Sequence, residues 1–401
     1  MVKHTFHAGA ARSLGDNMEI AAIHAREINM QLVAPFETSF GVTHDRRILL
    51  LEVIAKDGSS GWGEVTAGEG PFYNPETTDT AWIVLRKFLV PLLLGKTFDS
   101  PEAALHAMEP VRGHEMAKAA LENALWDLVA KQQSSSLAHL LGGTRSEISS
   151  GVSLGIHKDI GELLERVERG LAAGYQRVKL KIKPGHDIQV VSAVRNRFPD
   201  IQLTVDANSA YQLSDIALLE QLDRFDLTYI EQPLAWNEIY QHAELQRRLK
   251  TAICLDECIH NLRDAEAAIE LGACRVINIK LGRVSGHTEA RRIQAYCMQH
   301  NVPVWCGGML ESGIGRAHNI AMSSLPGFVL PGDVAASKRY WQEDIILPPV
   351  EVSSEGKIEV PTSPGIGFAI NKSRIEKLTV RQEEWKANQT VGGVAEPAMS
   401  R

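Results

Sequence analysis

Eight short apolar runs recur through the second half of the chain and alternate with longer segments whose apolar residues have helical spacing. The runs cover residues 151–156, 178–183, 203–208, 229–232, 253–257, 276–280, 302–306 and 328–333. Strands that alternate with helices form parallel sheets. Eight such units in succession predict an α/β fold of the (β/α)8, or TIM-barrel, type, with short loops between the elements.

The residues before this predicted barrel have a different pattern, with strand-like runs at 19–25, 27–33 and 48–54. Helical spacing then dominates over residues 77–141. The stretch 34–43 contains Pro, Gly and small polar residues and predicts a loop, although it carries Phe36 and Phe40. Strands followed by helices predict a separate α+β capping domain over residues 18–145.

The barrel is expected to span residues 146–345. The segment 346–382 is rich in proline and then charged, and we expect it to pack back on the capping domain. The two ends, residues 1–17 and 383–401, are expected to form a flexible extension and a free tail.

Composition limits the kinds of partner that the protein is expected to bind and the cell compartment in which it is expected to work. The chain carries 42 basic and 49 acidic residues, a formal charge of -7, without a basic stripe, which argues against nucleic acid and anionic membranes as partners. No apolar stretch approaches the ~18 residues of a membrane helix, and the first residues lack the apolar core of a secretory signal. Five cysteines without framework spacing indicate reduced thiols and a cytoplasmic protein. We therefore expect a small-molecule ligand.

Charged residues recur near the ends of successive predicted strands. Asp206, Glu231, Asp256 and Lys280 are separated by steps of 25, 25 and 24 residues, about the length of one strand–helix unit. The four side chains are therefore expected at equivalent ends of neighbouring strands, where the active sites of TIM barrels lie.

Side-chain alternation indicates which face these residues occupy. In the run 178–183, Lys179 and Lys181 share one face, and the apolar residues share the other. Helices cover the outer face of a barrel strand, which must be apolar, so the lysines are expected to point into the barrel. By the same argument, we expect an inward orientation for five further side chains, those of Asp206, Asn208, Asp256, Asn278 and Lys280.

Inward charges at these positions predict a metal centre, because buried charges must pair or bind metal. Three carboxylates on neighbouring strands form a set of hard oxygen ligands suited to Mg²⁺, with Mn²⁺ as the alternative: Asp206, Glu231 and Asp256. Lys181 and Lys280 come from opposite sides of the barrel and are expected to face each other over the metal. Lys179, beside Lys181, is expected to lower the pKa of a lysine toward that of a useful base.

This arrangement suits a small substrate with a carboxylate group. One lysine would take the proton from the α-carbon, and the metal would stabilise the enediolate. The second lysine would return a proton on the opposite face, giving racemisation, or a β-leaving group would depart, giving dehydration. The alternative is a barrel that binds an anion without catalysis, since structural ion-pair networks can imitate such sites.

Several runs also resemble motifs of a known superfamily. KLK at 179–181, VDAN at 205–208, IEQP at 230–233, LDE at 255–257 and NIK at 278–280 resemble the muconate-cycloisomerase-like branch of the enolase superfamily. PFETSFG at 35–41, VWCGGMLESGIGR at 304–316 and LPGD at 330–333 are more similar to the o-succinylbenzoate synthase / N-acylamino acid racemase family. The resemblance covers about residues 19–370.

The resemblance implies an enolase-type modified barrel, a Mg²⁺-dependent racemase or synthase activity, and assembly as a homo-oligomer. By this resemblance, Lys181 and Lys280 would be the acid/base pair, and the metal ligands would be Asp206, Glu231 and Asp256. The residues that would contact substrate are Ser153, Asn208, Gly308 and Leu310, and Phe36 to Phe40 would form a capping loop.

Two further residues are expected to support this site. Arg283 is shared with the family members that racemise, and Glu257 would orient one of the two lysines or cap the next helix. Muconate-type cycloisomerases and dipeptide epimerases of the same superfamily are the alternatives. The epimerases carry an Asp-x-Asp after the last strand to hold an ammonium group, whereas this chain has Gly332-Asp333-Val334, which makes that substrate class less favoured.

Two weaker motifs are interpreted as structural. GVSLG at 151–155 matches the G-x-S-x-G of serine hydrolases, but Ser153 falls within the first predicted barrel strand rather than at a strand–helix turn. Cys254 and Cys258 lack both C-x-x-C spacing and a second pair, so they indicate core thiols rather than zinc ligands.

Overall fold

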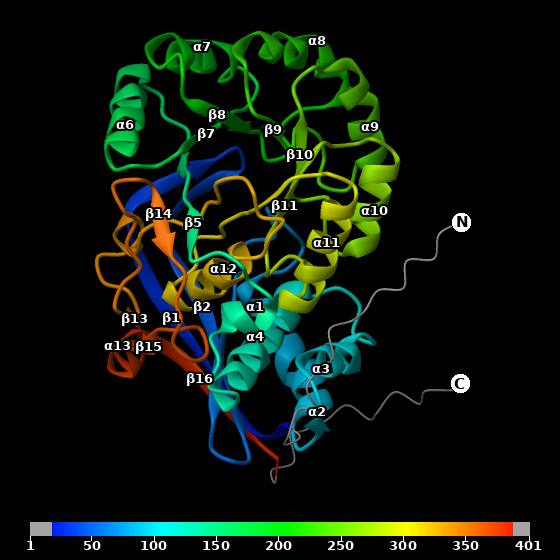
Figure 1. Ribbon diagram of the computed structural model, residues 1–401, viewed down its shortest axis with the longest axis vertical. Helices are drawn as coiled ribbons and strands as arrows, with labels where there is room; N and C mark the ends of the chain where they lie inside the picture. Colours follow the sequence, from blue (N-terminus) through cyan, green and yellow to red (C-terminus); the bar gives the residue numbers. More distant parts are fainter. Residues whose placement is uncertain (1–17, 388–401) are drawn as a thin grey trace.

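The computed structural model describes residues 18–387 and has two parts, a barrel with helices around it and a capping domain beneath it in the view of Figure 1. Seven parallel strands follow one another in chain order around the barrel. They are β6 (Val152–Leu154), β7 (Arg177–Lys181), β8 (Gln202–Asp206), β9 (Ile230–Glu231), β10 (Ile253–Leu255), β11 (Val276–Ile279) and β12 (Val304–Cys306). Seven of the eight predicted barrel strands are therefore confirmed, with shorter bounds.

The prediction of an eighth strand at 328–333 is wrong, because this segment does not form a regular strand. Phe328 forms one bridge to Val304 beside β12, and Gly332 forms another to Ser150 just before β6. Pro331 lies between the two bridges and cannot donate a ladder hydrogen bond. The segment still spans the gap between the first and last strands, so the barrel closes without a continuous eighth strand.

Helices alternate with the strands and cover the outer face of the barrel. They are α6 (Ile160–Ala172), α7 (Ile188–Arg197), α8 (Ile216–Leu219), α9 (Ile239–Arg248), α10 (Leu262–Glu270), α11 (His287–Gln299) and α12 (Gly313–Ser323), with short 3-10 turns at η2 (Leu213–Asp215), η3 (Glu220–Phe225) and η4 (Ser337–Arg339). The side chain of Asp159 caps α6 by accepting from the backbone of Glu162, and Leu163 and Val167 are buried against the barrel.

The capping domain is built on an antiparallel sheet with the order β16-β1-β2-β3. Its strands are β1 (Met18–Thr38), β2 (Gly41–Ala55), β3 (Ser60–Val65) and β16 (Thr379–Lys386), and the short β4 (Thr97–Phe98) pairs with β1. Its helical elements are α1 (Thr78–Val84), the π-helical turn η1 (Leu85–Leu89), α2 (Val90–Leu93), α3 (Pro101–Met108), α4 (Glu115–Gln132) and α5 (Leu137–Leu141). Strands followed by helices are confirmed here.

Three details of this domain differ from the sequence-based expectation. The two strands predicted at 19–25 and 27–33 form one strand, β1, and β3 was not predicted. The predicted loop at 34–43 is mostly the end of the β1–β2 hairpin, with a turn at Ser39 and Phe40. The ladder shifts register between Gln31 and Phe36 and then resumes, which accommodates Pro35 within the hairpin.

Two glycines of β3 explain how the sheet meets α4. A Cβ atom at Gly61 would come within 1.9 Å of the carbonyl oxygen of Ala124, and one at Gly63 would come equally close to that of Ala120. Strand β3 therefore packs directly against the helix backbone, where only glycine fits. This close contact fixes Glu64, the next residue along the strand.

The C-terminal segment connects the two parts. Strand β14 (Lys357–Glu359) pairs with β5 (Glu147–Ser149), β13 (Ile346–Leu347) pairs with β15 (Ala369–Ile370), and α13 (Lys372–Leu378) leads into β16. Residues 383–386 belong to β16 and pair with β1, so the predicted free tail begins too early. The predicted flexible extension, residues 1–17, and the predicted tail beyond residue 387 lie outside the described residues.

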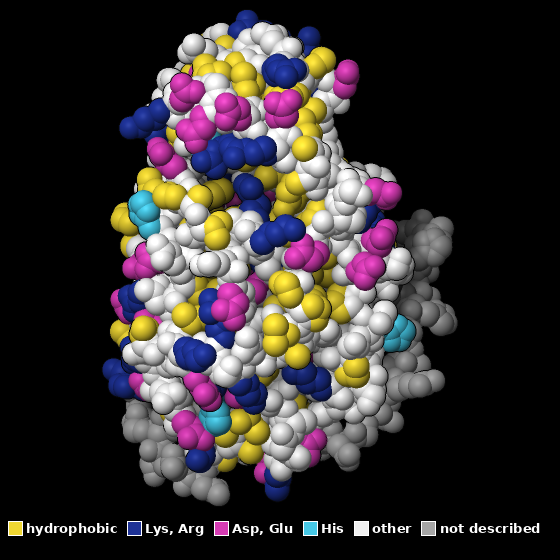
Figure 2. All heavy atoms as spheres, turned by 90° about the vertical axis from the view of Figure 1, so that its left-hand side faces the viewer, with side chains coloured by type: hydrophobic (Ala, Val, Ile, Leu, Met, Phe, Trp, Pro, Cys, Tyr) yellow, Lys and Arg dark blue, Asp and Glu magenta, His cyan; other side chains and the backbone are white. Residues whose placement is uncertain are grey.

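The hairpin of β1 and β2 extends from the capping domain to the carboxyl ends of the barrel strands. The amide of Ile156 donates to the carbonyl of Glu37 over 3.0 Å, and the hydroxyl of Ser39 donates to the carbonyl of Asn208 over 3.2 Å. The tip of the hairpin therefore covers the barrel mouth. Within residues 18–387, no helix is long and apolar enough to cross a membrane. On the face drawn in Figure 2, acidic and basic side chains are interspersed.

Candidate active site

Two adjoining cavities lie between the barrel mouth and the capping domain. The deeper one, of about 60 Å³, reaches Lys179 and Asp206 inside the barrel. The larger one, of about 420 Å³, opens between the hairpin tip and the capping-domain loop that carries Tyr73. Both are lined by Phe36, Lys181, Lys280, Gly308 and Leu310. The shared lining makes them two parts of one site.

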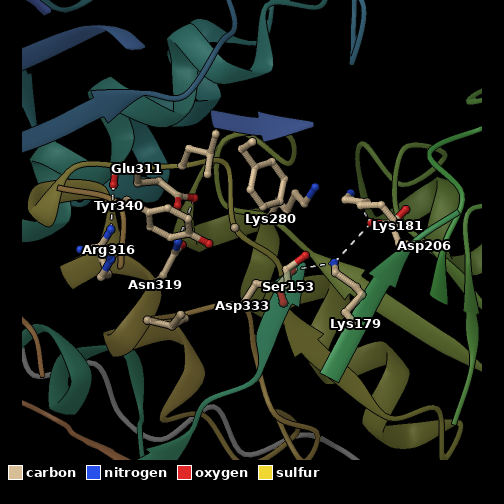
Figure 3. Close-up of a pocket in the computed structure, with 14 residues that line it drawn as sticks. Ser153, Lys179, Lys181, Asp206, Lys280, Glu311, Arg316, Asn319, Asp333 and Tyr340 are labelled. Atoms are coloured by element: carbon tan, nitrogen blue, oxygen red, sulfur yellow. Dashed lines mark hydrogen bonds and ion pairs between the residues drawn. The ribbon is translucent and has the colours of Figure 1, made fainter. Parts of the chain in front are cut away.

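Lys181 and Lys280 stand on two sides of this site. Lys181 ends β7, and Lys280 follows β11. Figure 3 shows their ammonium groups pointing toward each other across the pocket. The Nζ of Lys181 lies 2.6 Å from Oδ2 of Asp206 and 2.5 Å from Oδ1 of Asn208. The inward orientation of Lys179 and Lys181 agrees with the alternation of apolar and basic residues along β7.

The three carboxylates expected as metal ligands come from three neighbouring strands. Asp206 and Glu231 are register partners on β8 and β9, and Glu231 pairs with Cys254 on β10, so Asp256 lies two residues further toward the mouth. All three side chains are buried. Their sequence spacing therefore does bring them to one end of the barrel.

Each carboxylate is bound by a nitrogen donor. Lys179 Nζ lies 2.8 Å from Oε2 of Glu231 and 3.4 Å from Oδ2 of Asp206. The amide of Asn278 donates to the other oxygen of Glu231 over 2.8 Å. Within residues 18–387, no three acidic, histidine or cysteine side chains are arranged to hold a metal ion. The expected oxygen cage is thus not formed as such, because the carboxylates turn to lysine and amide groups.

These pairings control the protonation of the site. Burial opposes the ionisation of Asp206, yet the charges of Lys181 and Lys179 lower its pKa to about 2. Burial, and then the charge of Asp206, raise the pKa of Glu231. The same two causes raise the pKa of Glu257 to about 7. The charge of Asp206 therefore destabilises the charged forms of Glu231 and Glu257, and the nearby cations offset this only in part, whereas at Asp206 itself the cations prevail.

The pKa values of the lysines differ from the sequence-based expectation. Burial favours the neutral amine of Lys179, but the charges of Asp333, Glu231 and Asp206 outweigh it and raise its pKa well above the ordinary value. The pKa of Lys280 is also raised, against burial, by the acidic groups around it. The prediction that neighbouring lysines lower each other's pKa is wrong for Lys179, because the carboxylates around its amine outweigh both burial and the nearby cations.

The donor set nevertheless suits a divalent cation. Mg²⁺ and Mn²⁺ prefer carboxylate oxygens, and Asp206, Glu231 and Asp256 supply three at one end of the barrel. Among the described residues, Oε2 of Glu257 and Oδ1 of Asn278 are buried without a hydrogen-bond partner. Unpartnered oxygens beside Glu231 and Glu257, whose pKa values are raised, indicate a local shortage of positive charge, which a bound cation would relieve.

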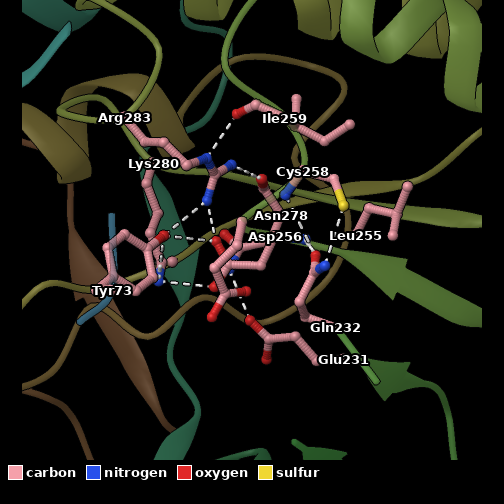
Figure 4. Close-up of polar contacts among 12 residues, drawn as sticks. Tyr73, Glu231, Gln232, Leu255, Asp256, Cys258, Ile259, Asn278, Lys280 and Arg283 are labelled. Atoms are coloured by element: carbon pink, nitrogen blue, oxygen red, sulfur yellow. Dashed lines mark hydrogen bonds and ion pairs between the residues drawn. The ribbon is translucent and has the colours of Figure 1, made fainter. Parts of the chain in front are cut away.

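Arg283 and Tyr73 surround Asp256 (Figure 4). The guanidinium group of Arg283 is fully buried, forms an ion pair with Asp256, and donates over 2.6 Å to each of the backbone carbonyls of Ile259 and Asn278. The hydroxyl of Tyr73 lies 2.9 Å from Oδ1 of Asp256, 3.1 Å from the amine of Lys280 and 3.0 Å from Arg283. Tyr73 thereby links the capping domain to one end of the site.

Glu257 supports Lys181 indirectly. Its Oε1 accepts from the side-chain amide of Asn208 over 3.0 Å, and Asn208 in turn accepts from Lys181. No hydrogen bond or ion pair joins Glu257 to either lysine among the described residues, and the side chain is buried rather than at the rim. Of the two expected roles, orientation of a lysine through Asn208 agrees with this geometry.

The remaining expected contacts lie around the cavities. Ser153 on β6 lines the deeper cavity, and Phe40 lines the larger one. Ser153 lies in the middle of its strand, and α6 begins only at Ile160. A nucleophile elbow needs the serine at a tight strand–helix turn, so the serine-hydrolase interpretation does not fit.

Sequence reasoning missed several residues of the site. Tyr73 lies in a loop without periodicity, so no pattern marks it. Asp333 was noted, but not its contacts with Lys179 at 2.6 Å and with Arg177 at 2.8 Å. The deeper cavity is also lined by Glu311, Arg316, Asn319 and Tyr340. The run 304–316 contains the first two of these, but only the fold shows which side chains face inward.

Comparisons with known proteins agree with this architecture. The family model "Mandelate racemase / muconate lactonizing enzyme, N-terminal domain" matches residues 20–142, and "Enolase C-terminal domain-like" matches residues 162–374. An o-succinylbenzoate synthase of Geobacillus kaustophilus is 51% identical over 362 residues, which are 90% of this chain and 96% of that protein. An N-succinylamino acid racemase of Thermus thermophilus is 46% identical over 371 residues, 92% of this chain and 100% of that protein.

A solved structure shows the same fold. A member of the enolase superfamily from Listeria innocua superposes with a TM-score of 0.90 at 43% sequence identity, covering 92% of this chain and 100% of that one. The match includes both the barrel and the capping domain.

Proposed function

The chain belongs to the enolase superfamily, and from that premise we propose that it abstracts the proton α to the carboxylate of a small substrate. The reaction would be racemisation of N-acyl amino acids, N-succinyl ones among them, or dehydration to o-succinylbenzoate. A relative named o-succinylbenzoate synthase is 51% identical over 90% of this chain, and one named N-succinylamino acid racemase is 46% identical over 92% of it. Both reactions begin with loss of the same kind of proton.

The placement of two amines carries this proposal. Lys181 and Lys280 point toward each other across a pocket that both line. A substrate α-carbon between them would offer one face to each amine. One lysine removes the proton, and the other returns a proton on the opposite face, which inverts the centre. In dehydration, the lysine that removed the α-proton returns it to the β-hydroxyl group, which departs as water, while the second lysine remains a cation beside the developing negative charge.

A lysine must lose its own proton before it can act as a base. The amine of Lys280 is held by Asp256 and Tyr73, and that of Lys181 by Asp206 and Asn208. These contacts keep the amines in place, and the groups around Lys280 favour its charged form. Weakening the ion pair with the carboxylate would therefore free the amine and lower its pKa, so that it can lose its proton and act as a base toward the substrate.

Asp206, Glu231 and Asp256 are the residues that would hold Mg²⁺ or Mn²⁺. When bound, the cation would supply positive charge beside the substrate carboxylate and so favour loss of the α-proton. The carboxylates would then exchange lysine contacts for metal contacts. Lys179 would remain held by Asp333, which already lies 2.6 Å from its amine.

The larger cavity suits the rest of an N-acyl amino acid. Its lining includes the apolar side chains of Phe36, Phe40, Phe72, Met309 and Leu310. Apolar and aromatic residues of this kind favour an apolar side chain, with a few polar groups fixing orientation. A dipeptide with a free ammonium group is less suitable, because the carboxylate of Asp333 is already paired with Arg177 and Lys179.

A substrate panel tests the proposal. The purified chain with Mg²⁺ is incubated with the o-succinylbenzoate precursor and with N-succinyl and N-acetyl amino acids, and product formation and optical rotation are followed. We expect turnover in at least one of these groups and none with dipeptides. Turnover of dipeptides alone, or of no N-acyl amino acid and no precursor, would contradict the proposed function.

A further inference from the structure

The loop after β12 presents its backbone to the site. Gly308 and Leu310 line both cavities, and Met309 lines the larger one. Leu310 has a φ of 55°, in the left-handed region that residues with a Cβ atom rarely occupy. Such a conformation persists only where its surroundings hold it. The shape of this part of the pocket therefore depends on groups outside the loop.

The barrel provides one set of restraints. Oε1 of Glu311 accepts from the backbone of Met309 over 2.8 Å and from the amide of Asn319 over 3.0 Å. The backbone carbonyl of Glu311 accepts from Arg316 and from the indole of Trp341, each over 3.0 Å. These contacts come from α12 and from the segment after the barrel, and they fix the loop from one side.

The capping domain provides the other set through a single carboxylate. Glu64 follows Gly63 on β3 and is buried at the boundary between the two parts. Its Oε1 accepts from the backbone of Ser312 over 3.1 Å, and its Oε2 accepts from the backbone of Gly315 over 3.0 Å and from the hydroxyl of Ser312. These donors lie at the N-cap and in the first turn of α12, just beyond Glu311, where a negative charge is favourable.

The fit at this contact is tight. A Cβ atom at Gly315 would lie 2.9 Å from Oε2 of Glu64 and 2.9 Å from Cβ of Glu311. Because β3 is itself held against α4 by Gly61 and Gly63, the carboxylate of Glu64 has a fixed position in the capping domain. Any shift of the capping domain on the barrel is therefore transmitted to Ser312 and Gly315.

We propose that Glu64 is a positioning residue: it transmits the seating of the capping domain to the backbone of Gly308 to Leu310 and so sets the shape of the substrate pocket. The expected effect of Glu64 on turnover rests on the proposed function, whereas its expected effect on the loop does not. It assigns to a residue that contacts neither the acid/base lysines nor the cavities a specific influence on substrate positioning.

Glu122 offers a matched control, because it is another buried capping-domain carboxylate at the same boundary. It accepts from the backbone of His287 over 2.8 Å and from that of Thr288 over 3.0 Å, at the start of α11. Burial raises the pKa of each of Glu64 and Glu122 to about 7. Glu64→Gln and Glu122→Gln thus remove the same kind of contact from two different barrel helices.

The experiment compares these variants in the full chain by steady-state kinetics, thermal unfolding and hydrogen–deuterium exchange. We expect Glu64→Gln to lower kcat/KM by about 10–100-fold, the cost of a small misplacement at a reacting centre, and to speed exchange over residues 307–316. Glu122→Gln should lower the melting temperature similarly but leave kcat/KM and the exchange of this loop near those of the wild type. Gly315→Ala, which displaces Oε2 of Glu64 from the barrel side, should reproduce the Glu64→Gln result.

The inference is overturned if Glu64→Gln and Glu122→Gln lose stability equally while both keep the wild-type kcat/KM, or if exchange over 307–316 is unchanged. If Glu64→Gln does not fold, Gly315→Ala decides by the same criteria. The exchange measurement needs no substrate. Failure of the proposed function would therefore appear as an inactive wild type, separately from failure of the coupling between Glu64 and the loop.

Discussion

The amine of Lys280 lies 2.8 Å from Oδ2 of Asp256, so a residue proposed as a base is paired with a residue proposed as a metal ligand. The same relation joins Lys181 to Asp206 at 2.6 Å. An ammonium group and a divalent cation cannot share these oxygens equally well, because both need the same lone pairs. Binding of the cation and release of the lysines are therefore expected to be coupled.

This coupling predicts how metal binding depends on pH. The pKa of Lys280 is raised by its acidic surroundings despite burial, so at neutral pH the proton stays on the amine and competes with the cation. We expect the affinity for Mg²⁺, measured by calorimetry, to increase from pH 7 to pH 9. In Lys280→Met this dependence should become flatter, and Asp256→Asn should bind Mg²⁺ weakly. Affinity that is independent of pH in the wild type would contradict the coupling.

The two lysines are predicted to serve opposite faces of the substrate. Lys181→Ala and Lys280→Ala should each lower racemisation by about 10²–10⁴-fold, the usual contribution of a general acid or base. Each variant should still exchange the α-proton of one enantiomer with solvent deuterium, and the two variants should differ in which one. Lys183→Ala is the control, because Lys183 continues the same strand face but is 39% exposed at the rim. Equal exchange of both enantiomers by either lysine variant would exclude a two-base mechanism.

Tyr73 is predicted to support turnover from the capping domain. Tyr73→Phe removes the hydroxyl that contacts Asp256, Lys280 and Arg283 and keeps the ring. We expect a decrease in kcat/KM of about 10-fold, because the amine of Lys280 loses one of the contacts that position it. Pro71→Ala, a change at an exposed residue of the same loop that is not among the lining residues of either cavity, is the control for altered loop packing. A Tyr73→Phe enzyme as active as the wild type would show that the hydroxyl is not needed.

A buried histidine pair predicts how stability depends on pH. Nε2 of His318 donates to the carbonyl of Trp62 over 2.7 Å, so its Nδ1 accepts from Nε2 of His287 over 2.9 Å. Within residues 18–387, Nδ1 of His287 has no hydrogen-bond partner. Burial, and then His318, lower the pKa of His287 well below its ordinary value. The unfolded chain therefore binds protons below about pH 6.5 that the folded protein does not bind.

The free energy of unfolding should consequently fall as the pH decreases below 6.5, by up to about 1.4 kcal/mol per pH unit for one such histidine. Urea unfolding at pH 5 and pH 7 measures this. His287→Gln should be less stable at pH 7 but should lose less stability on acidification than the wild type does. The exposed His106 serves as the control through His106→Gln. An identical pH dependence in His287→Gln and the wild type would contradict this account of the pair.

The sequence predicts the faces of the strands better than the partners of the side chains. Alternation along β7 was sufficient to place Lys179 and Lys181 inside the barrel, since an apolar outer face is required under the helices. Equal spacing was sufficient to bring Asp206, Glu231 and Asp256 to one end. Neither pattern states which oxygen meets which nitrogen, so the lysine–carboxylate pairs, and with them the raised lysine pKa values, appear only in the structure.

Segments without periodicity were predicted least well. The hairpin end at 34–43 was expected to be a loop because Pro35 and Gly41 are turn residues, but pairing with the neighbouring strand overrides this local preference. The segment 328–333 has the composition of a strand, yet it forms only two bridges. Tyr73 and Glu64 act across the boundary between the two parts, and no local pattern in the sequence encodes contacts between distant segments.

The most direct test of the account is proton NMR of an N-succinyl amino acid incubated with the chain in deuterium oxide. With Mg²⁺ present, we expect the α-proton signal of both enantiomers to disappear and the optical rotation to decay to zero. After removal of divalent cations with a chelator, the signal should persist, and added Mg²⁺ or Mn²⁺ should restore the exchange. An α-proton signal that persists with Mg²⁺ for every N-acyl amino acid and for the o-succinylbenzoate precursor, or exchange that continues at full rate without a divalent cation, would contradict the central claim.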